Sequence, residues 1–280
     1  MELDKYSQAL IALTDSVGSA SFYQNINTLI SCIIDFDELL VMQFNKTANA
    51  KLHYRYGIEG TPNQLQGEDA WKYLSRLYVL DPFYRVFSDK GEHGFFALKE
   101  IAPDEFANLY SSYFNFLTLS DEAGYLFPID SENALHIDLS RFADSPPFTA
   151  LELQQLKCLF LPLQDLCQKH LSTIDLNEEN AHSNVQDLLL NFGKEILTNK
   201  EYQVCQLLLK GHSAKAVASE MNIGYETVKM HKKNIYGKTS LSSQSELLAL
   251  FINLLQSESL DKGIDHLAKY VSKQQHLTIA

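Results

Sequence analysis

The sequence lacks the features of several protein classes. No apolar run reaches the roughly 18 residues of a membrane span, and the start, MELDKYSQAL, lacks the basic-then-apolar order of a signal peptide. The cysteines form no CxxC pair and lie among apolar neighbours, at Cys32, Cys158, Cys167 and Cys205. We therefore expect a cytoplasmic protein without a membrane partner, whose cysteines are free thiols.

Catalytic motifs are also missing. The chain contains no GxSxG, no HExxH, no phosphate-binding P-loop and no pair of histidines at metal-ligand spacing. Two histidines in expected strands, His53 and His136, are interpreted as structural groups. The sequence therefore predicts no enzyme, no catalytic residue, no metal site and no cofactor.

Positive charge is scarce and unevenly placed. The formal net charge of the 280 residues is -12. Residues 196–256, which we call the basic module, hold seven lysines against four glutamates, so their charge is +3 and the remainder carries -15. This length predicts about two domains. An acidic body joined to a basic module indicates that only the module approaches a polyanion.

The basic module reads as short helices separated by turns. Thr198 and Glu201 form a capping box that opens the first helix, and Gly211 supplies a left-handed stop. Ser213 caps a second short helix. A lysine-rich segment follows after a tight turn, and Ser243 opens a last, strongly apolar helix.

The lysine-rich segment, GYETVKMHKKNIYGK, has two distinct faces. Val228 and Ile235 fall at helical spacing on an inward face, whereas Lys229, Met230 and Lys233 project from another. Two short helices joined by a tight turn, with a basic second helix, form the helix-turn-helix plan. Its second helix fits the major groove of DNA, which is about 12 Å wide. We therefore expect an all-α, four-helix domain that binds double-stranded DNA.

Residues 197–255 resemble the LuxR-type helix-turn-helix of bacterial transcription regulators, whose pattern runs roughly LTxRE…G…IAxxLxISxxTVKxHxxxIxxKL. The chain has LTNKE, then Gly211, VASEMNI, TVKMH, NI and Lys238 at matching spacings. It departs from the pattern at Lys200, at Gly224 and where KTSL replaces KL. The resemblance implies DNA-contacting residues: Lys229, Met230 and Lys233 at base edges, Thr227 and Lys238 at the backbone.

Arginine is absent from the basic module, since all four arginines precede it. Lysine reads guanine as a point charge, without the two-pronged geometry of arginine. We therefore expect modest intrinsic specificity, sharpened by a homodimer that spaces two modules along the DNA.

The first 172 residues predict an α+β domain. Strands are expected at ELLVMQFN, KLHYRYG, GFFALKEI, EAGYLFPI and ALHIDLS. Helices are expected at residues 3–17 and 22–34, at EDAWKYLSRLY and DEFANLYSSYFNFL, and from Thr149 onward. This succession indicates a five-stranded antiparallel sheet flanked by helices, of the PAS/GAF-like kind.

The middle of this domain is dense in aromatic residues. Buried tyrosines need a partner for their hydroxyl, so this density favours a polar-lined pocket for a small molecule. Asp81, before Pro82, could cap the next turn or accept from the N–H of a ligand. The quorum-sensing receptors of the LuxR family carry a tryptophan, a tyrosine four residues on and then an Asp-Pro pair. The chain is similar at Trp71 and at Asp81 with Pro82, but it departs from the pattern at Ser75, which occupies the tyrosine position. The candidate ligand-binding residues are Tyr54, Tyr56, Trp71, Tyr73 and Asp81.

These patterns divide the chain into four parts. Residues 1–172 form a sensory and dimerisation domain, 173–195 a linker with a short helix, 196–256 the DNA-binding domain and 257–280 a polar tail. The predicted function is a transcription regulator whose N-terminal domain binds a small-molecule effector. Two alternatives stay open: an N-terminal domain that only dimerises or docks a protein partner, and an enzyme of the sensory-domain fold.

Overall fold

A computed structural model describes residues 3–57, 77–105, 119–173, 184–255 and 263–279. The chain forms two compact units. Unit 1 comprises residues 1–74, 81–101 and 116–182, and unit 2 comprises 75–80, 102–115 and 183–280. Among the helices that the structure describes, none has the length and apolar character needed to cross a membrane.

Unit 1 is built on a five-stranded sheet, as the sequence predicts. Its strands are β1 (Glu38–Asn45), β2 (Lys51–Gly57), β3 (Gly94–Ala97), β4 (Leu119–Pro128) and β5 (Asn133–Phe142). They lie in the order β2-β1-β5-β4-β3, and neighbouring strands are antiparallel. This arrangement confirms the α+β prediction. The third strand is shorter than expected, because helix α5 (Leu98–Ile101) begins directly after it.

The helices of unit 1 are α1 (Leu3–Asp15), α2 (Phe22–Ser31), α4 (Pro82–Lys90), α5, α7 (Ala150–Cys158) and α8 (Phe160–Thr173). The 3-10 helix at Leu77–Leu80, which precedes α4 in the chain, belongs to unit 2. The long helix expected after Thr149 is two helices, which meet at Leu159. Helix α4 was not predicted beyond a capped turn. The two helices expected at residues 68–78 and 104–117 lie almost wholly outside the described residues.

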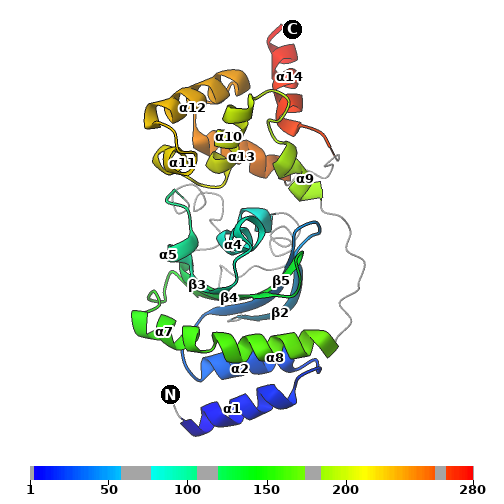
Figure 1. The fold of residues 1–280 in the computed structure, drawn as a ribbon, viewed down its shortest axis with the longest axis vertical. Helices are drawn as coiled ribbons and strands as arrows, with labels where there is room; N and C mark the ends of the chain where they lie inside the picture. Colours follow the sequence, from blue (N-terminus) through cyan, green and yellow to red (C-terminus); the bar gives the residue numbers. More distant parts are fainter. Residues whose placement is uncertain (1–2, 58–76, 106–118, 174–183, 256–262, 280) are drawn as a thin grey trace. The chain divides into compact units, whose positions relative to one another are not determined.

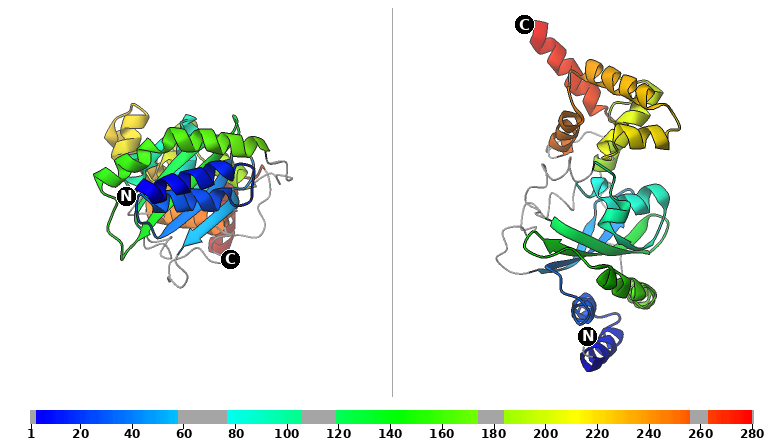
Figure 2. Two further views of the ribbon diagram at one scale, coloured as in Figure 1. Left: turned by 90° about the horizontal axis from the view of Figure 1, so that it is seen from below. Right: turned by 90° about the vertical axis from the view of Figure 1, so that its left-hand side faces the viewer.

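The two faces of the sheet have different surroundings. Helices α2, α7 and α8 cover one face, with α1 packed outside α2 (Figures 1 and 2). The core on this helix-covered face includes Leu39, Val41, Tyr125, Ile137 and Leu163. Because side chains alternate along a strand, the residues between these point to the opposite face, where α4 lies (Figure 1).

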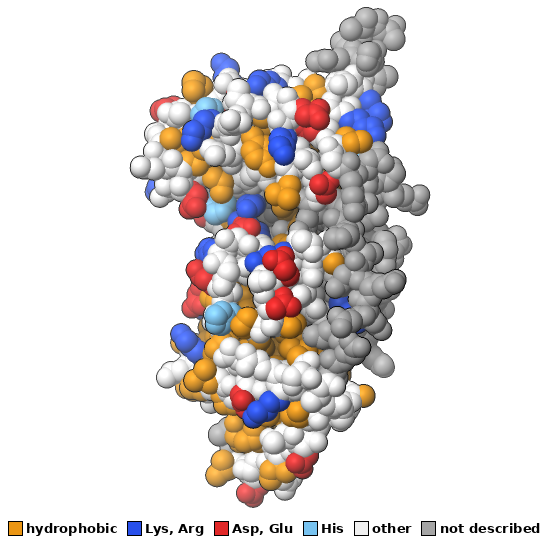
Figure 3. All heavy atoms as spheres, turned by 45° about the vertical axis from the view of Figure 1, so that its right-hand side comes forward, with side chains coloured by type: hydrophobic (Ala, Val, Ile, Leu, Met, Phe, Trp, Pro, Cys, Tyr) orange, Lys and Arg blue, Asp and Glu red, His pale blue; other side chains and the backbone are white. Residues whose placement is uncertain are grey.

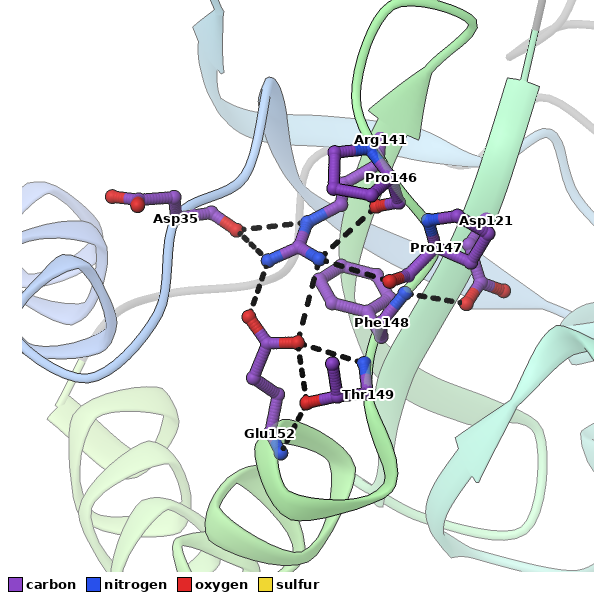
Figure 4. A network of polar contacts seen from close by, with 8 residues as sticks. All are labelled: Asp35, Asp121, Arg141, Pro146, Pro147, Phe148, Thr149 and Glu152. Carbon is purple, nitrogen blue, oxygen red and sulfur yellow. Dashed lines mark hydrogen bonds and ion pairs between the residues drawn. The ribbon is translucent and has the colours of Figure 1, made fainter.

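Arg141, at the end of β5, ties three parts of unit 1 together (Figure 4). Its guanidinium donates to the backbone oxygen of Asp35 at 2.7 Å and to that of Pro146 at 3.1 Å. It also forms an ion pair with Glu152 at 2.7 Å, in the first turn of α7. The hydrogen bond from Arg141 to Glu152 is the main cause that lowers the pKa of Glu152 to about 2, whereas burial acts in the opposite direction. The guanidinium thus fixes the lead-in to β1 and the start of α7 on β5.

The helices of unit 2 are α9 (Asn184–Asn191), α10 (Asn199–Leu209), α11 (Ala214–Glu220), α12 (Tyr225–Thr239), α13 (Gln244–Leu255) and α14 (His266–Ile279). Helices α10 to α13 match the four-helix expectation. The last helix belongs to this unit, although the sequence indicates a polar tail there. Buried Asp265 accepts backbone N–H bonds from Gly193 and Glu195, both at 2.8 Å, and Leu267 is fully buried.

All four cysteines are free thiols, as expected. Cys167 and Cys205 are buried, whereas Cys158 is exposed and Cys32 is half-buried. Burial raises the pKa of Cys205 to about 12, so this thiol stays protonated at neutral pH.

We expect Arg141→Lys to lower the free energy of unfolding of unit 1 by at least about 1.5–3 kcal/mol, because lysine cannot reach Asp35, Pro146 and Glu152 together and a hydrogen bond to a charged group contributes about that much. Urea unfolding at pH 7 measures it. Arg85→Lys is the control, since Arg85 makes an i,i+4 ion pair with Asp89 that lysine can retain. An equal loss in both variants would contradict the role given to the guanidinium.

Candidate nucleic-acid interface and effector site

Local capping sets the helix starts of the basic module. The Glu201 carboxylate accepts from the Thr198 backbone N–H at 2.9 Å, and the Thr198 hydroxyl accepts from the Glu201 N–H at 3.4 Å. The Ser213 hydroxyl accepts from the Ala216 N–H at 3.2 Å at the start of α11. Gly211, between α10 and α11, has a φ of +83°, where an L side chain is strained. All three predicted signals are confirmed.

Helix α12 separates an inward face from an outward one. Val228 and Ile235 are fully buried against the rest of the domain. On the other side Met230 is 52% exposed, and Lys229 and Lys233 are exposed beside it. Thr227, at the start of the helix, is half-buried. The structure therefore brings together Lys229, Met230 and Lys233, the three residues expected at base edges.

The exposed lysines stand in a mixed environment. The Lys229 ammonium lies 3.1 Å from the Glu226 carboxylate and 5.1 Å from the ring centre of Tyr225. Basic and acidic side chains are interspersed on the face shown in Figure 3. An exposed i,i+3 ion pair contributes little to stability, so Lys229 can exchange this partner for a phosphate or a base.

Lys238 lies elsewhere, at the end of α12. Its ammonium donates to the Glu201 carboxylate at 2.7 Å and to the backbone oxygen of Ile196 at 3.2 Å. Burial would raise the pKa of Glu201, but hydrogen bonds from Lys238 and Thr198 outweigh it and lower that pKa from 4.5 to about 2. Lys238, whose side chain is 38% exposed, thus joins the end of α12 to the buried Glu201 at the start of α10.

The α4-facing side of the sheet carries a cluster of ionisable groups. Paired strands β1, β5 and β4 place Glu38, Ser140 and Glu122 in one row. His136 and Asp138 follow on β5 and are both buried. Arg55 on β2 forms an ion pair with Glu38 at 2.7 Å. We call Glu38, Glu122, His136, Asp138 and Ser140 the polar face of the sheet.

Asp81 sits at the start of α4 and acts as its N-cap. Its carboxylate accepts from the backbone N–H of Phe83 at 2.7 Å and of Tyr84 at 3.4 Å. The capping alternative is therefore observed. The same carboxylate also lies close to the polar face, because its negative charge contributes to the raised pKa values of Glu122 and Asp138. The main cause of both raised pKa values is burial.

Of the other candidate ligand residues, the two that the structure describes, Tyr54 and Tyr56, do not join Asp81. Tyr54 packs against the core on the helix-covered face of the sheet. Tyr56 is 41% exposed, with its ring 6.0 Å from that of Phe36. Trp71 and Tyr73 lie outside the described residues. On β2, Tyr54 pairs with Val41 and Tyr56 with Leu39 of β1. Paired residues point to the same face of a sheet, so both tyrosines share the helix-covered face with Val41 and Leu39.

Sequence reasoning missed three residues of the polar face: Glu122, His136 and Asp138. A signal was present, because His136 and Asp138 alternate with apolar residues in the expected strand ALHIDLS. Polar residues at every second position of a buried strand indicate one polar face. Their proximity to Glu122 follows only from the pairing of β4 with β5.

Comparison with known proteins identifies the basic module. Residues 195–251 match the model of the "Bacterial regulatory proteins, luxR family". The C-terminal part of the chain is therefore a LuxR-family helix-turn-helix domain, the DNA-binding part of regulatory proteins rather than of enzymes. An HTH-type transcriptional regulator of Aeromonas salmonicida, described by its position in the exeN 3′ region, is 29% identical over 185 residues, which are 62% of this chain and 94% of that protein.

Two further similarities cover more of the chain than the family model does. The oxygen regulatory protein NreC of Staphylococcus aureus is 27% identical over 201 residues, covering 70% of this chain and 86% of that protein. The crystal structure of the VqsR LBD domain of Pseudomonas aeruginosa is similar in fold, with a TM-score of 0.51 and 21% identity over 61% of this chain and 97% of that domain.

We expect Lys238→Met to lower the free energy of unfolding of unit 2 by about 1.5–3 kcal/mol at pH 7, because Glu201 loses a charged donor. The pKa of Glu201 is depressed in the folded state, so its contribution is complete above about pH 4.5 and is lost as the pH falls toward about 2. The difference between variant and parent should therefore shrink over that range.

Urea unfolding between pH 7 and pH 3 measures this difference. Lys200→Met is the matched control, since exposed Lys200 bonds to the neutral side chain of Gln203. A penalty for Lys238→Met that stays constant with pH would show that Glu201 is not the group responsible.

Proposed function

We propose that this chain is a transcription regulator in which a small molecule, bound by unit 1, controls operator binding by a dimer. The LuxR-family domain supplies DNA binding. The single observation that supports an effector is the polar face, where Glu122, His136 and Asp138 meet on the side of the sheet that faces α4. The fold likeness to the VqsR LBD domain supports the same conclusion.

DNA is read by the outward face of α12. Lys229, Met230 and Lys233 are exposed there, while Val228 and Ile235 hold the helix on its scaffold. A helix of 15 residues presented in this way enters the major groove with its N-terminal half at the bases. Lys238 serves a structural role in this proposal, because its ammonium bonds to Glu201 and Ile196.

A homodimer spaces two such helices along the operator. In the helical segment after Thr149, Leu156 and Leu163 are fully buried in unit 1 and are not available to a second copy. Leu151 and Leu161 on the same helices are 66% and 71% exposed. We therefore assign the contact to these two leucines, whose apolar surface a second copy would remove from water.

We expect Lys233→Ala to weaken operator binding by about 1–3 kcal/mol and to relax the preference at one base pair, if Lys233 contacts a base edge. If it contacts only a phosphate, the slope of log K against log salt concentration should become shallower by about one, and by the same amount for every sequence tested. Fluorescence anisotropy with an operator selected from random DNA distinguishes the two. Lys90→Ala, which removes an exposed helical lysine of unit 1, should change neither quantity. Parent-like binding by Lys233→Ala and Lys229→Ala would refute the assignment of α12.

For the effector, Asp81→Asn should weaken binding more than it lowers stability, because asparagine caps a helix about as well as aspartate but carries no charge. Native mass spectrometry of the purified protein identifies a retained molecule, and its saturable effect on the emission of Trp71, the only tryptophan, gives its affinity. A large loss of stability with unchanged affinity would make Asp81 a structural cap alone.

A further inference from the structure

Three possible metal ligands meet on the polar face of the sheet. His136 and Asp138 are two residues apart on β5, so their side chains share a face. Glu122 comes from the neighbouring strand β4. The nitrogen of His136 and one carboxylate oxygen each of Glu122 and Asp138 all lie within 4.8 Å of one another.

The imidazole of His136 is held in one orientation. Its Nδ1 lies 3.2 Å from the backbone oxygen of Tyr125, and its ring lies between those of Phe44 and Phe83, with ring centres 5.1 and 4.7 Å away. A Cβ at Gly124 would lie 2.7 Å from His136 Cε1, so the glycine makes room for the ring. Because a carbonyl oxygen only accepts, Nδ1 carries the proton and Nε2 keeps a lone pair.

The groups that face the cluster are hydrogen-bond acceptors. Within the described part of the chain, Nε2 of fully buried His136 and Oδ1 of Asp138, a residue only 5% exposed, have no hydrogen-bond partner. The hydroxyl of Ser140 donates to the other oxygen of Asp138 at 2.9 Å. Buried acceptors without donors are costly, and these two face the carboxyl group of Glu122, so the three side chains favour a positively charged occupant.

The types of ligand narrow the choice of cation. One imidazole nitrogen with two carboxylates suits zinc, manganese or iron, whereas magnesium and calcium prefer oxygen ligands alone. A metal-binding histidine usually donates its other N–H to a carbonyl or carboxylate, as His136 does to Tyr125. A metal ion fits in the space between the ligand atoms, whereas an organic ammonium also needs a cavity for its carbon atoms.

We propose that Glu122, His136 and Asp138 bind a divalent first-row transition-metal ion, with Asp81 adding negative charge from the start of α4. The ion satisfies the buried acceptors and separates two carboxylates that would otherwise repel each other. This proposal uses the same polar face that supports the proposed effector site. It is tested separately, because metal binding is measured without DNA and without an effector.

The experiment uses the full chain, freed of metal by a chelator and then dialysed. Titration calorimetry with Zn²⁺ and Mn²⁺ should give one site per chain for at least one of the two ions, and that ion should raise the melting temperature. Mg²⁺ and Ca²⁺ at the same concentrations should not. Co²⁺ should bind with the visible absorption of a site that contains a nitrogen ligand.

Isosteric variants separate a ligand from a structural group. Glu122→Gln and Asp138→Asn should lower the affinity for the ion by more than about 100-fold. Loss of a residue that only supports a ligand lowers metal affinity by about 10–100-fold, and loss of the ligand itself should lower it more. The same variants should melt at the parent's temperature or higher without metal, since each removes one of two crowded carboxyl groups. His136→Gln should also lose the ion. The control is His93→Gln, which removes an exposed histidine and should bind like the parent.

Several results would overturn the metal site. One is the lack of a stoichiometric ion in the parent with any metal tested, and another is undiminished binding in Glu122→Gln and Asp138→Asn. Stabilisation by a diamine such as putrescine, with none from the metals, would assign the acceptors to an organic cation instead. The Lys233→Ala variant tests DNA binding by α12, and its result would not change the metal titrations or melting temperatures. The proposed DNA-binding face and the proposed metal site can therefore be refuted independently.

Discussion

The antiparallel register of β1, β5 and β4 decides which side chains of unit 1 meet the helices and which meet α4. Leu39, Val41 and Ile137 alternate with Glu38, Leu40 and Asp138 along paired strands, so a one-residue slip would bury the carboxylates under α2 and α8 and expose the core. The helices fix this register further, since the hydroxyl of Tyr125 on β4 donates to the backbone oxygen of Leu156 in α7 at 2.8 Å. The polar face follows from that constraint.

Both units use a buried or partly buried charge to join segments that are distant in sequence. In unit 1, Arg141 joins the lead-in to β1 with the start of α7. In unit 2, Lys238 joins the end of α12 to the start of α10, and Asp265 joins the segment before α10 to α14. Each charge accepts or donates several bonds, which offsets the cost of taking it out of water.

The two functional surfaces are built differently for a physical reason. The face of α12 that we propose to read DNA lies on one continuous helix, with its residues at i, i+1 and i+4, and it needs only a scaffold beneath it. The polar face is assembled from two strands and is approached by the start of α4, so its composition depends on strand pairing. A helical surface can therefore be predicted locally, whereas a sheet surface cannot.

The sequence by itself determined the helix-turn-helix domain, because capping signals at Thr198 and Ser213, the glycine at 211 and the buried spacing of Val228 and Ile235 are all local. It also determined the five strands, whose apolar runs are distinct. Only the tertiary structure decided that Tyr54 and Tyr56 face the helices, that Lys238 binds Glu201, and that Glu122 meets His136 and Asp138. Those outcomes depend on strand pairing and on contacts between residues far apart in the chain, which no spacing along a single segment records.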